Sequence, residues 1–219
     1  MLLIQKESNL KYIKKLYYAR GLSVPEIAKK MNLSLGAIYS LMRKYNLKRR
    51  GYSEQNRIRF AKNPPSFNVI SRLSPKDKEL RTAGIMLYWA EGYQSEVANH
   101  VDFSNSRPEI ILIFLKFLRE VCGVNELKLR SHLYCYSNQN VDDLIRFWSK
   151  VTMVPIDQFT KPYVRKDFNP KKMNKMRYGL LYIRYNDKKL LDLIRVWIKN
   201  FVKEYGMGVG SEAAKRVTL

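Results

Sequence analysis

The sequence predicts an α+β protein, with a small all-helical N-terminal domain followed by a larger domain in which helices and strands alternate. Three observations lead to this prediction. Residues 1–50 contain short runs with apolar side chains at helical spacing. Residues 51–78 are polar and broken by prolines, which is typical of a linker. Residues 79–205 mix helical and strand patterns, and residues 206–219 form a small, polar tail that we expect to be flexible.

The first domain is predicted to contain three helices joined by short turns. Residues 10–20 form the first helix, and Ser23 caps a second helix with Glu26 completing a capping box. Asn32 lies in the next turn, where asparagine tolerates a positive φ, and Ser34 caps the third helix. Five apolar side chains are expected to form the core between these helices: Ile27, Met31, Leu33, Ile38 and Leu41.

This arrangement resembles the helix-turn-helix family over the whole of its supersecondary unit. The resemblance implies that the third helix enters the major groove of DNA, with its N-terminal residues at base edges and later cations at phosphates. A plain three-helix bundle with a charged surface is the alternative. The residues expected to contact DNA here are Ser34, Leu35, Gly36, Tyr39, Ser40, Arg43, Lys44, Lys48, Arg49 and Arg50.

The charge balance favours a polyanionic partner. The chain has 41 Lys and Arg against 19 Asp and Glu, a formal net charge of +22. Residues 1–60 hold fourteen cations and three acids, which is half of the excess. Such an excess attracts nucleic acid and releases counterions when phosphates are neutralised. An anionic membrane surface is the alternative, but no segment has the separated basic and apolar faces of a surface helix.

Composition also bounds the compartment and the kind of site. Cys122, Cys135, His100 and His132 are too few for a Cys/His zinc framework, and we expect both cysteines to be buried free thiols. The apolar start at residues 1–4 is too short for a signal peptide, and no stretch approaches the roughly 20 residues of a membrane span. We therefore expect a cytoplasmic, nucleoid-associated protein without membrane contact.

The larger domain is predicted as a mixed helix and strand unit rather than a doubly wound parallel sheet, because no glycine-rich phosphate loop follows a strand. Asn105 or Ser106 is expected to cap its second helix, and the three tryptophans are expected in the core. The strand at 127–136 places Leu127, Leu129, Ser131, Leu133 and Cys135 on one face. The expected helices span 79–91, 108–121, 141–153 and 190–202, and the expected strands span 98–103, 127–136 and 178–185.

The apolar helix of this domain ends in Ala90-Glu91-Gly92, and an acidic residue in that position is unusual. This ending, and the strand, turn and amphipathic helix that follow, resemble the LAGLIDADG homing-endonuclease superfamily over residues 80–205. The sequence departs from the family at Met86, where the motif has its inner glycine, and it leaves room for one strand where the family has a hairpin. Ala83, Gly84 and Ala90 supply the small surface of the helix.

The resemblance implies a homodimer through helix 83–91, with Glu91 of each chain as catalytic metal ligand binding Mg²⁺ at the scissile phosphate of double-stranded DNA. The implied activity is metal-dependent phosphodiester cleavage. Some members of the superfamily are transcription regulators that keep the scaffold without cleavage, often fused to a helix-turn-helix, and this is the alternative. A Glu91 side chain that is simply solvated is the structural alternative.

A basic segment at 159–177 combines cations with Tyr163 and Phe168, which suits contact with nucleic acid. We expect a DNA-facing loop here, and a solvated basic loop is the alternative. RNA binding through this segment is less favoured, because a major-groove helix suits B-form DNA. His132 is expected to face solvent from its strand. The cations expected at DNA are Lys161, Arg165, Lys166, Lys171, Lys172 and Lys175.

Overall fold

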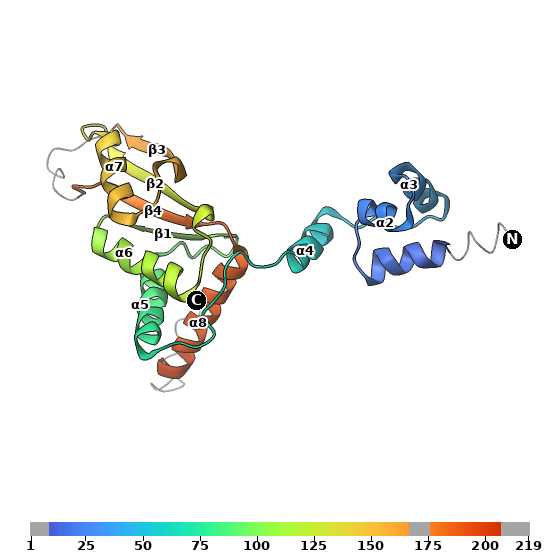
Figure 1. Ribbon diagram of the computed structural model, residues 1–219, viewed down its shortest axis with the longest axis horizontal. Coiled ribbons are helices and arrows are strands. Elements are labelled where there is room, and N and C mark those ends of the chain that lie inside the picture. The colour runs from blue at the N-terminus through green and yellow to red at the C-terminus, as the bar shows by residue number, and fades with distance from the viewer. Residues whose placement is uncertain (1–8, 167–175, 207–219) are drawn as a thin grey trace, which may run out of the picture. The chain divides into compact units, whose positions relative to one another are not determined.

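The computed structural model describes residues 9–166 and 176–206, and the chain divides into two compact units, Met1–Pro64 and Pro65–Leu219. The fold is mixed α+β, as predicted, with helices in both units and a four-stranded sheet in the described part of the second (Figure 1). Within the described segments no helix is long and apolar enough to cross a membrane.

The first unit is entirely helical over its described residues. Residues 9–14 are α-helical and run directly into a π-helical turn, after which Gly21 reverses the chain with a φ of 62°. A positive φ costs little at glycine because it has no Cβ. The further elements are η1 (Lys15–Ala19), α2 (Val24–Met31), α3 (Leu35–Lys44) and α4 (Tyr52–Lys62).

Part of the apolar core predicted for the first unit is confirmed. Ile27 and Ile38 are fully buried, and Met31 and Leu41 pack against the core while partly exposed. The prediction for Leu33 is wrong, because this side chain in the turn is 38% exposed. The core also contains Ile13, Leu16 and Tyr17, which share one face of the predicted first helix, and Met42 of α3, which the sequence pattern did not single out.

The segment 51–78 is more ordered than a linker. Helix α4 occupies much of it, although none of its residues is buried. Further on, Phe67 pairs with Val124 in a β-bridge, and the Ser66 hydroxyl donates to Asp187 Oδ2 at 2.7 Å. Residues that follow Pro64 therefore belong to the second unit. Proline still marks the division between the two units, since it removes a backbone donor.

The second unit builds one sheet in the order β1-β4-β2-β3. Strand β4 is antiparallel to β1 and β2, whereas β3 is parallel to β2. Figure 1 shows the strands in this order, with α5 and α6 next to β1. The elements are α5 (Pro75–Glu91), β1 (Val101–Asn105), α6 (Pro108–Lys116), η2 (Phe117–Val121), η3 (Glu126–Lys128), β2 (Leu129–Tyr136), α7 (Val141–Thr152), η4 (Ile156–Gln158), β3 (Phe159–Arg165), β4 (Leu180–Tyr185) and α8 (Lys188–Tyr205).

The prediction of a basic loop at 159–177 is wrong for residues 159–165. These residues form β3, an edge strand of the sheet. The register with β2 shifts between His132 and Tyr134: His132 pairs with Thr160, whereas Tyr134 pairs with Tyr163. Pro162 lies within this irregularity. Proline is tolerated at a bulge of an edge strand because no ladder hydrogen bond is needed from it.

Several boundaries differ from the prediction for local reasons. Helix α5 begins early because Ser74 and Asp77 form a capping box. Helix α6 has Arg107 as its N-cap without a side-chain hydrogen bond, and Asn105 Oδ1 instead accepts from the Arg107 N–H. Strand β2 begins at Leu129, so Leu127 lies in η3 and is 77% exposed.

The core of the second unit lies between one sheet face and the helices. Leu129, Ser131, Leu133 and Cys135 alternate on the buried face of β2, as predicted. Both cysteines are buried free thiols, and burial raises the pKa of Cys122. Trp148 is fully buried and Trp197 partly buried, but Trp89 is 49% exposed and is not a core residue.

Candidate nucleic-acid interface

The N-terminus of α2 and the turn between α2 and α3 have the local geometry that the sequence predicts. Ser23 Oγ accepts from the Glu26 N–H at 3.3 Å, and Glu26 Oε2 accepts from the Ser23 N–H at 2.6 Å. These hydrogen bonds with Ser23 lower the pKa of Glu26. Asn32 has a φ of 52°, and Ser34 Oγ accepts from the Ala37 N–H at 3.1 Å. Two capped helices thus meet at a fixed turn.

Helix α3 presents most of its predicted contact residues to solvent. Arg43 and Lys44 lie in its last turn, and Tyr39 is partly buried. Gly36 has open space around it, since an added Cβ would meet only Ser34 Oγ, at 3.9 Å. The side of α3 available to a ligand therefore combines an apolar end with hydroxyl and cationic groups. Its exposed residues, with Ser34 at the N-cap, are Ser34, Leu35, Gly36, Ser40, Arg43 and Lys44.

The three cations after α3 have different surroundings. Lys48 and Arg49 are exposed, and the Arg49 guanidinium lies 5.2 Å from the centre of the Tyr39 ring. Arg50 is only 9% exposed: its guanidinium lies 4.0 Å from the Tyr17 ring centre and donates to the Leu22 carbonyl. The expected phosphate contact of Arg50 is therefore replaced by a structural role, because these partners hold its side chain inside the unit.

A second surface, which the sequence reasoning missed, is the sheet face opposite the core. Tyr134 stacks on Tyr163 of β3 with ring centres 5.2 Å apart, and His132 meets Tyr182 of β4 edge to face at 5.8 Å. The sequence signal for this face is the alternation along β2, where every second residue from Arg130 to Tyr136 is aromatic or basic, and it continues in Tyr182 and Arg184 of β4. The residues of this face that are exposed or partly exposed are Arg130, His132, Tyr134, Tyr136, Thr160, Tyr163, Arg165, Tyr182 and Arg184.

One acidic group anchors the charges of this face. Asp102 is 7% exposed and faces Arg184 across the β1–β4 pair, and Arg184 Nε donates to its Oδ2 at 3.0 Å. His100 Nε2 lies 3.5 Å from the same oxygen. The second oxygen, Oδ1, is buried without a hydrogen-bond partner among the described residues. Asp102 thus fixes Arg184 on the open face, at a sequence separation that no local pattern reveals.

His132 is partly buried on this face rather than fully solvated. Its Nδ1 lies 3.1 Å from the Thr160 hydroxyl oxygen. Burial lowers the pKa of His132, and the nearby Arg184 lowers it further. The imidazole is therefore neutral near pH 7, since an ordinary histidine already titrates below that value. The positive charge of the sheet face comes from its arginines.

The basic segment is described only in part. Lys161, Arg165 and Lys166 are exposed, on β3 or directly after it. Arg165 Nη1 donates to the Tyr134 hydroxyl at 3.3 Å, so one cation of the segment belongs to the aromatic sheet face. The other three predicted cations, Lys171, Lys172 and Lys175, lie outside the described residues.

Glu91 is the last residue of α5 and is exposed. The next residue, Gly92, forms a β-bridge with Phe103, and the Tyr93 N–H donates to the Asp102 carbonyl at 2.9 Å. The chain after α5 therefore returns along β1 as a short hairpin-like extension. Across residues 9–166 and 176–206 no group of three or more His, Cys, Asp or Glu could hold a metal. Glu91 is therefore an exposed carboxylate without other metal-ligating side chains grouped around it in these residues.

One face of α5, the predicted dimer helix, packs within its own unit. A Cβ on Gly84 would lie 2.1 Å from the Phe117 ring, so this glycine serves packing within the unit and offers no surface to a partner. Ala90 is exposed and Ala83 partly exposed. Of the three small residues of α5, only these two alanines therefore remain open.

The comparisons with known proteins identify no relative of this chain. No protein family, no curated protein and no solved structure matches it. The geometry and charge of the two surfaces therefore carry the functional conclusion.

Proposed function

We propose that this protein binds double-stranded DNA at specific sequences, with α2 and α3 as a helix-turn-helix whose second helix reads the major groove. The observation that carries the proposal is the exposed face of α3 behind a fixed turn. Ser40 and Arg43 on this face offer hydrogen-bonding groups of the kinds that read base edges. Lys44 and Lys48 supply charge for the phosphates beside the groove.

The open sheet face supports a second DNA contact by the other unit. Its arginines and exposed tyrosines resemble the mixture of cations and flat rings that nucleic-acid surfaces use. The face is formed by β2 with its parallel neighbour β3 and its antiparallel neighbour β4. The strong positive charge of the chain favours both contacts through counterion release.

DNA cleavage is the second candidate function, and its support is the position of Glu91 as the last residue of α5; the exposure of this side chain also fits the solvated alternative. In the LAGLIDADG superfamily, which the sequence resembles, two chains pair through this helix and each supplies one carboxylate. Glu91 suits this role, because Mg²⁺ is commonly held by one or two carboxylates together with waters and phosphate oxygens. A bound Mg²⁺ would stabilise charge on the phosphate and activate water. Without cleavage, the same surfaces serve a transcription regulator.

A cleavage assay separates the enzyme from the regulator. Plasmid carrying the gene's own flanking DNA is incubated with Mg²⁺ or EDTA and with wild type, Glu91→Gln or Glu96→Gln. If the protein is an endonuclease, wild type and Glu96→Gln cut only with Mg²⁺ and Glu91→Gln does not. Glu96 is a matched control, because it is an exposed carboxylate shortly after the same helix.

The assay contradicts the cleavage proposal if all three proteins bind the plasmid and none cuts it. Light scattering on the same samples tests the pairing through α5. The cleavage proposal requires a homodimer, so a monomeric mass of 25.9 kDa would count against it as strongly as intact plasmid.

A further inference from the structure

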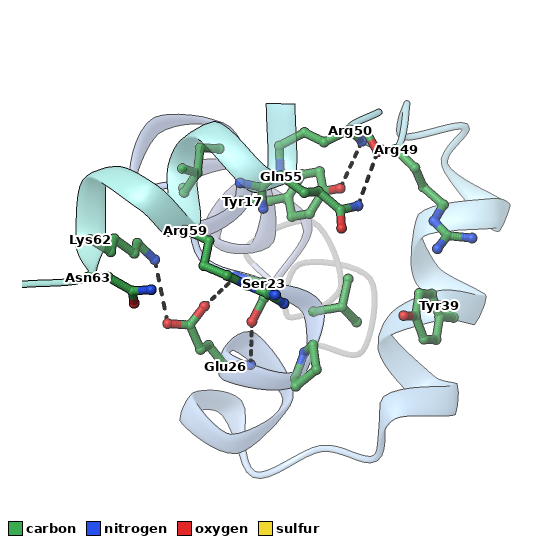
Figure 2. Close-up of a pocket in the computed structure, with 14 residues that line it drawn as sticks. Tyr17, Ser23, Glu26, Tyr39, Arg49, Arg50, Gln55, Arg59, Lys62 and Asn63 are labelled. Carbon is green, nitrogen blue, oxygen red and sulfur yellow. Dashed lines mark hydrogen bonds and ion pairs between the residues drawn. The ribbon is translucent and has the colours of Figure 1, made fainter. Parts of the chain in front are cut away.

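The first unit contains a pocket that is not lined by Ser40, Arg43, Lys44 or Lys48, the residues that we propose bind DNA. It has a volume of about 410 Å³ and lies between the start of α2, α3, α4 and the segment that joins α3 to α4 (Figure 2). This volume lies within the range of small-molecule sites. The lining side chains on which the inference rests are Tyr39, Arg49, Arg50, Gln55, Arg59 and Lys62.

Helix α4 forms one wall of the pocket through specific contacts. Gln55 Nε2 donates to the Arg50 carbonyl at 3.1 Å, and Lys62 Nζ lies 3.5 Å from Glu26 Oε1. A Cβ on Gly21 would lie 3.2 Å from Ile58 Cγ2, a tight contact, so α4 packs closely against the chain at this glycine. The wall is therefore built by the fold of this unit, although α4 buries no residue completely.

The lining carries an excess of positive charge. Four cations face the pocket, and the one acid among the lining residues, Glu26, is already bonded to Ser23 and paired with Lys62. In the described residues Arg49, Arg50 and Arg59 form no ion pair. The Arg50 Nε is moreover buried without a hydrogen-bond partner in that part of the chain. Three guanidinium charges thus lack a counter-ion among the residues that the structure describes.

We propose that this pocket binds a small organic anion that carries at least two carboxylate or phosphate groups. Guanidinium groups bind such oxyanions in a bidentate manner. A single phosphodiester of a DNA backbone would fill only part of the volume, and Arg50 lies too deep, at 9% exposure, to meet a duplex surface. A separate small anion fits both the size and the depth of the site.

The position of the pocket links it to α3. Tyr39 and Arg49 line the pocket, and Tyr39 also belongs to the helix that we propose reads DNA. A bound anion would neutralise charge beside that helix and weaken its attraction for phosphates. This regulatory consequence rests on the proposed function, whereas binding of the anion does not.

Calorimetric titration of the full chain with citrate and with pyrophosphate, at constant ionic strength and without DNA, tests the site. Wild type is expected to bind at least one of these probes saturably, one per chain. Arg59→Gln is expected to weaken binding at least about tenfold, because one charge-assisted hydrogen bond is lost. Arg57→Gln is the matched control: Arg57 is exposed on α4 and does not line the pocket, so binding should equal wild type.

Two outcomes overturn the proposal. One is the absence of saturable binding for both probes; the other is an equal loss in Arg57→Gln and Arg59→Gln, which indicates attraction to overall charge. A duplex titration of the same variants then identifies the source of the phosphate. If only Arg59→Gln loses duplex affinity and neither probe binds, the pocket receives the DNA backbone and not a small anion. Because the probe titrations contain no DNA, they stand even if the DNA-binding proposal fails.

Discussion

Replacing Arg43 by alanine is expected to weaken binding to the preferred duplex roughly tenfold to a hundredfold, as the loss of one base-reading arginine does. Arg43 is exposed in the last turn of α3 and forms no ion pair within the described residues, so its removal should leave the fold intact. Fluorescence anisotropy with the preferred and a scrambled duplex measures the effect. Affinity for the scrambled duplex should change far less, because only base contacts carry sequence information.

Two control variants make this result specific to α3. Lys48→Ala removes an exposed cation expected at a phosphate, so it should lower affinity for every sequence and reduce the salt dependence by about one phosphate contact. Lys30→Ala removes an exposed cation from the end of α2 and should have little effect. Equal losses for Arg43→Ala and Lys30→Ala would mean that binding reports only net charge.

Replacing Gly84 by alanine is expected to lower the free energy of unfolding by about 1–3 kcal/mol, the usual cost of overpacking a core. The new Cβ would lie 2.1 Å from the Phe117 ring. That ring cannot withdraw easily, because it is fully buried between Phe114 and Trp197, with ring centres at 5.8 and 6.2 Å. Denaturant unfolding of the second unit measures the change.

A second glycine and a compensating change serve as controls for this prediction. Gly36→Ala also adds one methyl group to a helix, but it meets only Ser34 Oγ at 3.9 Å, so stability should not fall. Phe117→Leu should recover part of the loss when combined with Gly84→Ala, because it makes room for the methyl group. If Gly84→Ala instead retains wild-type stability and changes only the oligomeric mass, this glycine belongs to a contact between chains.

Local signals of the sequence were sufficient for the start of α2 and for the turn between α2 and α3. The Ser23–Glu26 capping box and the positive φ of Asn32 depend only on residues a few positions apart, and both are confirmed. The alternation along β2 likewise predicted its buried face. Helix α4 was missed because it has no buried residue and therefore no apolar stripe. Helices of this kind are held by tertiary contacts such as that of Lys62 with Glu26.

The features that the sequence did not reveal depend on distant partners. Strand β3 contains Pro162 and several cations, which argue against a strand until an edge position with an irregular register is available. Arg50 follows other exposed cations, and its burial depends on Tyr17 and the Leu22 carbonyl. The Asp102–Arg184 pair joins two strands that are neighbours only in the folded sheet. The spacing of residues along a single sequence does not predict such long-range contacts.

Selection of duplexes from a random-sequence DNA library tests the central proposal most directly. The full chain is incubated with the library at physiological ionic strength, and bound duplexes are recovered and sequenced over several rounds, with Arg43→Ala in parallel. The proposal predicts that wild type enriches one sequence motif and that Arg43→Ala loses or relaxes it while still retaining DNA through charge. Recovery of DNA without any enriched motif, or the same motif with both proteins, would contradict sequence reading by α3.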